Sequence, residues 1–124
     1  MNAPDHFEIM GDLAVSRLTG HMSLDQAAQM VIAAIALARE KGIGKLLVVA
    51  SDLTGFGPPS VLSRLIFVKE WASAAGGAVC VALVARPEMI DREKFGVTVA
   101  RNRGLIGDVF VSEDEAMAWL QGVR

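Results

Sequence analysis

The segment Lys45-Leu-Leu-Val-Val-Ala50, continued by Ser51-Asp-Leu-Thr-Gly-Phe-Gly-Pro-Pro-Ser60, decides the fold class of this chain. Its first part is an unbroken apolar run, which is typical of a strand covered on both faces, as in parallel sheets. The glycines and prolines that follow predict a loop, and Ser60 is a suitable N-cap for a helix. The segment therefore predicts a strand–loop–helix unit, and ligands of such sheets bind where the strands end.

Further regular elements are predicted on both sides of this segment from hydrophobic periodicity and capping residues. Two short apolar runs separated by Gly11 and Asp12 predict an antiparallel hairpin, because both residues tolerate the positive φ of a tight turn. The expected elements are strands over 7–10 and 13–19, a helix over 24–41, a strand over 45–50, a helix from Ser60 to 75, a strand over 78–85, a weaker helix over 89–103, a strand over 109–111 and a last helix after Ser112.

The element order is thus ββαβαβαβα. Alternation of strands and helices after the hairpin requires parallel strands joined by right-handed crossovers. We therefore expect an α/β fold with a five-stranded mixed sheet, whose first strand is an antiparallel edge, and four helices. A chain of 124 residues suits a single domain over 1–124.

Charge and cysteine content exclude several classes of function. The chain has 12 Lys+Arg against 14 Asp+Glu, so nothing favours binding of nucleic acid or an anionic membrane. One cysteine, Cys80, excludes an intramolecular disulfide and suits a reducing cytoplasm. The N-terminal residues lack the pattern of a signal peptide, and no apolar run reaches the roughly 18 residues of a membrane span. We expect a cytoplasmic protein.

Hydropathy is the unusual property of the composition. The mean hydropathy is +0.41 and 52% of the residues are hydrophobic, which is high for a small domain. On the helix after Ser60, Ile66 and Phe67 fall among polar residues such as Lys69 and Glu70 at a step of about 100° per residue. These two side chains predict an exposed apolar patch, and we expect it to form a homodimer.

Asp52-Leu-Thr-Gly55 at the end of the central strand, the closing segment Val109–Leu120 and the element order together resemble the STAS domain, and most closely its SpoIIAA-like branch. The resemblance implies a signalling protein similar to anti-sigma factor antagonists, with a kinase-like or sigma-pathway protein as partner. In antagonist members a serine at the start of the helix after this loop is phosphorylated, which by position implies Ser60 as candidate phosphoacceptor. The usual Asp-Ser-(Ser/Thr)-Gly context is replaced here by Gly57-Pro-Pro-Ser60, so binding is favoured over phosphotransfer.

Polar residues at the predicted carboxyl ends of the strands form one candidate site. His21, Asp52, Thr54 and Arg86, with Ser60 at a helix start, could together hold an anion such as a phosphoserine or a carboxylate. Each residue also has a purely structural explanation. Asp52 can bind its own loop backbone and Ser60 can be only a cap. Arg86 can pair with Glu88 or Asp91, while His6 and His21 can simply be surface residues.

Catalysis and metal binding have little support. Cys80 lies in a buried apolar strand, where a thiolate is disfavoured. His21 and Asp52 could act as a base and its orienting carboxylate, but no nucleophile pattern accompanies them. Two distant histidines make a poor zinc site. We therefore expect no catalytic residue, metal or cofactor.

Two functions remain from different classes. The first is a non-enzymatic regulatory or protein-interaction module that acts through the strand–loop–helix turn 51–67, with Ile66 and Phe67 on its surface. The alternative is a domain that binds a small molecule or lipid in an apolar site near the strand ends, as the hydropathy suggests.

Overall fold

A computed structural model, which describes residues 7–91 and 94–123, contains the expected mixed sheet. The first strand pairs antiparallel with the second, and all other neighbours are parallel. The strands lie in the sheet in chain order, so each parallel connection crosses over through helical structure. They are β1 (Phe7–Met10), β2 (Leu13–His21), β3 (Lys45–Thr54), β4 (Cys80–Val84) and β5 (Gly107–Phe110).

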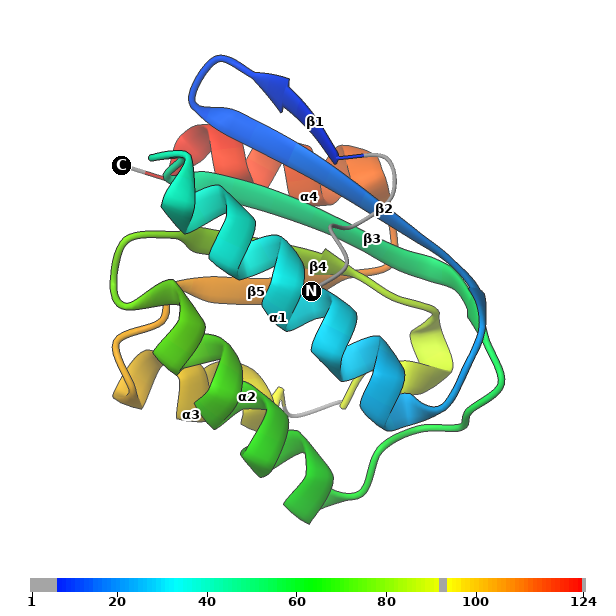
Figure 1. The fold of residues 1–124 in the computed structure, drawn as a ribbon. Helices are drawn as coiled ribbons and strands as arrows, with labels where there is room; N and C mark the ends of the chain where they lie inside the picture. The colour runs from blue at the N-terminus through cyan, green and yellow to red at the C-terminus, as the bar shows by residue number, and fades with distance from the viewer. Residues whose placement is uncertain (1–6, 92–93, 124) are drawn as a thin grey trace.

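The helices cover both faces of the sheet unequally. Three of them lie on one face and one lies on the other (Figure 1). None of the helices found in the described ranges is long and apolar enough to cross a membrane. They are α1 (Leu24–Glu40), α2 (Val61–Ala75) and α3 (Phe95–Asn102) on the first face and α4 (Glu113–Gly122) on the second, with a 3-10 turn at Pro87–Met89. The fold class and element order predicted from the sequence are confirmed.

Alternation along the strands divides the core into two layers. The layer under α1, α2 and α3 contains Leu46, Val48 and Leu53 of β3, packed against alanines of the helices. The layer under α4 contains Leu47 and Val49, the intervening residues of the same strand. Because both faces of β3 are buried, the strand reads as a continuous apolar run.

Capping residues set the helix boundaries as the sequence suggested. Ser23 accepts a hydrogen bond from the Gln26 amide, and the Gln26 side chain accepts one from the Ser23 amide, which completes the capping box. Ser112 caps α4 by accepting from the Glu115 amide. Gly76 ends α2 in the left-handed region at φ 55°.

The strands β2 and β3 extend further than the sequence predicted. They pair as far as His21 and Thr54, with a shift in register between Arg17/Val49 and Thr19/Asp52. One residue of β2, Leu18, opposes two of β3, Ala50 and Ser51, so β3 carries a bulge of one residue. Asp52 and Thr54, which the sequence suggested as loop residues, are thus strand residues. The main chains of β2 and β3 pair with each other beyond the point where the pairing of β3 with β4 ends.

The predicted helix over 89–103 is wrong in its first half. Among the described residues between β4 and α3, which are 85–91 and 94, only Pro87–Met89 is helical, as a 3-10 turn, and α3 begins at Phe95. Lys94, just before α3, has a positive φ of 49°, which a continuous helix does not allow. Its ammonium group binds the Asp108 carboxylate at 2.8 Å and the Val109 carbonyl at 3.3 Å. These contacts favour a helix start at this point.

Candidate functional site

The tips of β2 and β3 form the first part of the predicted site. His21 Nδ1 lies 3.2 Å from Thr54 Oγ1, and the two residues are register partners across the strands. The Met22 amide then donates to the Thr54 carbonyl at 2.9 Å. The structure therefore brings together two of the predicted site residues, His21 and Thr54.

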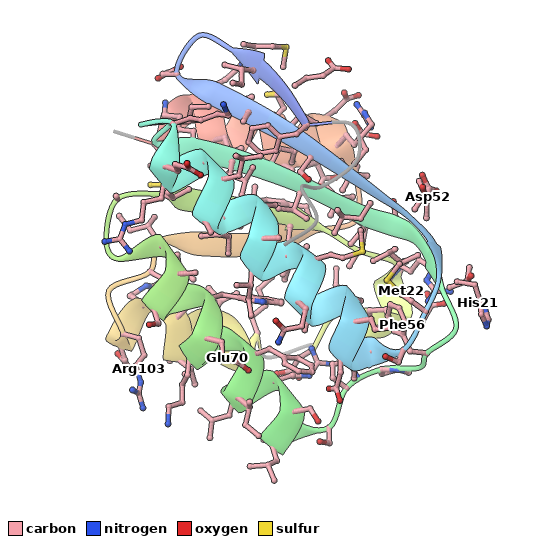
Figure 2. All side chains as sticks on the ribbon, viewed as in Figure 1. His21, Met22, Asp52, Phe56, Glu70 and Arg103 are labelled. Atoms are coloured by element: carbon pink, nitrogen blue, oxygen red, sulfur yellow. The ribbon has the colours of Figure 1, made fainter. Side chains whose placement is uncertain are left out.

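Gly55 is required directly after this pair. Its φ is 106°, and a Cβ atom at this position would lie 2.5 Å from the Met22 carbonyl oxygen. A side chain would therefore clash with fixed backbone in a conformation that only glycine adopts readily. The glycine turns the chain sharply inward, so that Phe56 packs against the core beside Met22, while His21 and Asp52 point outward (Figure 2).

Asp52 forms no hydrogen bond to His21 or Thr54 among the described residues. It is an exposed strand residue, so the proposed role in tying down a loop is wrong. Its neighbour Leu53 is buried in the layer under α1, which directs Asp52 to the opposite face. There the pKa of Arg17 is raised, chiefly by the hydrogen bond to Glu113 and in small part by the charge of Asp52.

Arg86 follows the end of β4. It is half-buried and precedes the 3-10 turn, whose Met89 amide donates to the Arg86 carbonyl. Among the described residues its guanidinium forms no ion pair or hydrogen bond, so the pairing proposed with Glu88 or Asp91 is wrong. Within the same residues no hydrogen bond joins Arg86, His21, Asp52 or Ser60 to one another. The predicted convergent anion site therefore stays a prediction.

Ser60 is the exposed N-cap of α2. Its hydroxyl oxygen accepts from the Ser63 amide at 3.1 Å, and its proton is donated to Ser63 Oγ at 3.1 Å. The first turn of α2 contains no acidic residue, so the positive end of the helix dipole is unneutralised there.

Beside Ser60, α2 presents apolar side chains to solvent. We define the α2 outer patch as Val61, Leu62 and Ile66, which are 66%, 65% and 47% exposed. Phe67 was expected with Ile66 on the surface, and this expectation is wrong. Phe67 is half-buried and stacks on Trp71, with ring centroids 6.3 Å apart.

The other side of α2 borders an apolar cavity of about 170 Å³. It lies between the three helices and the sheet, near the carboxyl ends of β3 and β4. Trp71 fixes α2 to α1 across it by donating from Nε1 to the Ala28 carbonyl at 3.2 Å. The sequence suggested an apolar site near the strand ends but not these walls, which contain Ala28, Val31, Phe67, Val81, Leu83 and Ala100.

Cys80 lies on the α4 side of the sheet at the start of β4, where it packs against the core. Burial raises the pKa of its thiol, and the charge of Lys45 only partly offsets this. The thiol is thus a weak nucleophile near neutral pH. No group of three His, Cys, Asp or Glu side chains suited to a metal ion is present in residues 7–91 and 94–123. His6 lies outside these residues.

Comparison with known proteins adds a fold assignment. No family model matches the sequence, and no curated protein does. Among solved structures, the anti-sigma factor antagonist SpoIIAA in its unphosphorylated form matches with a TM-score of 0.53 and 20% identity over 94% of this chain and 97% of SpoIIAA. The chain has the SpoIIAA fold.

A proposed anti-sigma factor antagonist from Thermotoga maritima matches with a TM-score of 0.55 and 17% identity, over 93% of this chain and 92% of that protein. The STAS resemblance in the sequence is therefore confirmed at the level of the fold. Within this SpoIIAA fold, Ser60 and the α2 outer patch lie on the solvent side of α2, and the cavity lies on its inner side.

Proposed function

We propose that this chain is a non-enzymatic regulatory module that binds an anti-sigma factor through the α2 outer patch and Ser60. The exposed patch carries the proposal. Leu62 and Ile66 are four residues apart on one helix face, where they form an apolar surface that no described residue covers. The two solved structures of similar fold are of anti-sigma factor antagonists, which supports this class of partner.

Ser60 is the proposed control point of that surface. A phosphate on its oxygen would lie at the start of a 15-residue helix whose first turn has no acidic side chain. Such a position stabilises negative charge. The same charge would lie beside Val61 and Leu62 and disfavour their burial against a partner.

The experiment uses the anti-sigma factors encoded in the same genome as probes, with affinities measured by calorimetry. Leu62→Glu should weaken binding at least tenfold, because it places a charge in the apolar centre of the contact. Ile106→Glu is the matched control, since Ile106 is 53% exposed outside the patch and should leave the affinity unchanged.

Phosphorylation is tested separately at Ser60. Ser60→Asp should weaken binding, whereas Ser60→Asn keeps a good N-cap without charge and should bind as the wild type does. Wild-type affinity in both Leu62→Glu and Ser60→Asp would refute the proposed surface. Failure of every anti-sigma factor to bind the wild-type chain would refute the partner class.

A homodimer through Ile66 stays a prediction. The inward position of Phe67 removes one of the two side chains first assigned to that contact, and Val61 and Leu62 replace it. Sedimentation of the wild type and of Ile66→Glu tests it: a wild-type monomer at high concentration would contradict it. A cytoplasmic location also stays a prediction.

A further inference from the structure

The cavity under α2 is larger than the packing of an ordinary core leaves. Protein interiors contain few voids larger than a water molecule. This one measures about 170 Å³. An engineered apolar cavity of about 150 Å³ stays free of water and binds benzene. The volume is therefore sufficient for an apolar group the size of a phenyl ring.

Small residues on the surrounding helices create the space. Ala27 and Ala28 of α1 face it from one side, and Gly96 and Ala100 of α3 from another. A methyl group added at Gly96 would meet only a Val68 methyl at 3.5 Å, which is an ordinary contact. The Trp71 ring also lines the cavity and bonds to the Ala28 carbonyl of α1.

The charges that line the cavity leave one cation available. Lys94 is paired with Asp108 at 2.8 Å, and Arg64 donates to the Met89 carbonyl at 3.1 Å. Asp91 also lines the cavity and has a contact of its own. Among the described residues that line the cavity, the three cations Arg64, Arg86 and Lys94 exceed the two acids Asp91 and Asp108 by one positive charge. Arg86 is the cation that has no partner among the described residues.

We propose that this cavity binds a small monocarboxylate, with its apolar tail between α1, α2 and α3 and its carboxylate on Arg86. Arg86 follows the carboxyl end of β4, where α/β sheets place their ligands. Its planar guanidinium matches a carboxylate with two parallel hydrogen bonds. A single excess positive charge suits a monoanion. The proposal is independent of any partner on the α2 outer patch, which lies on the other side of the helix.

Hexanoate and its neutral counterpart 1-hexanol are the probes, added to the full chain in an amide NMR titration. The wild type should bind both, with shifts concentrated at Val31, Val81 and Leu83, and hexanoate about tenfold more tightly because of the charged hydrogen bonds. Arg86→Gln should remove the preference for hexanoate and keep the affinity for 1-hexanol. Arg103→Gln is the matched control, because Arg103 does not line the cavity (Figure 2).

A second variant tests the cavity. Ala100→Leu fills it and should weaken both probes at least tenfold, while Ala118→Leu, on the exposed side of α4, should change neither. Absence of saturable binding by the wild type would refute the proposal. So would shifts that lie outside the cavity, or an unchanged preference for hexanoate in Arg86→Gln.

Discussion

The two faces of the sheet are packed in opposite ways. Beneath α4, large side chains fill the layer: Leu13, Leu47 and Leu120 are buried, and the Phe110 and Trp119 rings pack with centroids 5.7 Å apart. Beneath α1, α2 and α3, alanine and glycine line much of the interface, and a cavity remains. One helix thus covers its face closely, while three helices leave space. The comparison suggests that the α4 face contributes mainly stability and the other face has room for binding.

Leu120→Ala should have the largest effect on the unfolding free energy, because it leaves a cavity in the closely packed layer under α4. Leu120 is fully buried, and removing a buried leucine side chain costs about 3 kcal/mol of unfolding free energy. Urea denaturation measures it. Leu62→Ala, at an exposed position of α2, should cost less than about 0.5 kcal/mol. Equal losses of unfolding free energy in the two variants would contradict the close packing of the layer under α4.

Enlarging one alanine on each face sharpens the comparison. Ala82→Leu overfills the layer under α4 and should cost about 2 kcal/mol, since added methylenes strain a packed core. Ala100→Leu extends into the cavity and should change the unfolding free energy by less than about 1 kcal/mol or increase it. Thermal unfolding of both variants gives the difference. A larger loss in Ala100→Leu would contradict the two packing schemes.

The ion pair between Arg17 and Glu113 joins β2 to α4, at 2.8 Å. The pKa of Glu113 is lowered from its ordinary value of 4.5, first by the hydrogen bond from Arg17. The pair therefore stabilises the fold above about pH 4.5, and this contribution is lost as the pH falls through the lowered pKa. Glu113→Gln should cost about 0.5 kcal/mol at neutral pH, as exposed pairs do, and nothing at pH values where the carboxyl is protonated.

A double-mutant cycle isolates that pair. Arg17→Gln should lower the unfolding free energy less in the Glu113→Gln background than in the wild type, because the ion pair is already absent there. A cost of Glu113→Gln that persists unchanged in acid would show that the charge is not its source.

Ser16→Ala should have the smallest cost in unfolding free energy. Ser16 is fully buried in β2, between Ala14 and Leu18 on the α1 face by alternation, and its hydroxyl has no hydrogen-bond partner among the described residues. Removing an unpaired buried hydroxyl should keep or raise the unfolding free energy, by up to about 1 kcal/mol. Ser112→Ala, which loses a cap, should instead cost about 1 kcal/mol. A clear loss in Ser16→Ala would indicate a contact that the packing does not explain.

The fold was predictable because its signals are local. The apolar run 45–50 and the capping residues Ser23, Ser60 and Ser112 each specify an element through their neighbours in the chain. The extension of β3 to Thr54 was not, because its pairing with β2 depends on residues more than thirty positions away. The position of Lys94 before α3 depends likewise on Asp108, a contact across the fold.

The site was harder to predict than the fold. Phe67 was placed on the surface because α2 is apolar almost all around, so periodicity alone does not define its inner face. The cavity depends on small residues from different helices, which read in the sequence as ordinary helix formers. Arg86 was identified correctly as a residue after a strand end, because Pro87 directly follows it and ends the apolar run.

The bulge in β3 allows this segment to lose one residue without changing which side chains face the core. Before it, Leu46 and Val48 face α1; after it, Leu53 does so, an odd number of positions later. Loss of one residue at the bulge, such as Ser51, would restore regular alternation from Val48 through Ala50 to Leu53, so Leu53 would still face α1 and Asp52 would stay on the other side. In the regular stretch 45–49, by contrast, loss of one residue would exchange the core side chains of the two faces, so the bulge is the point where this strand can change length.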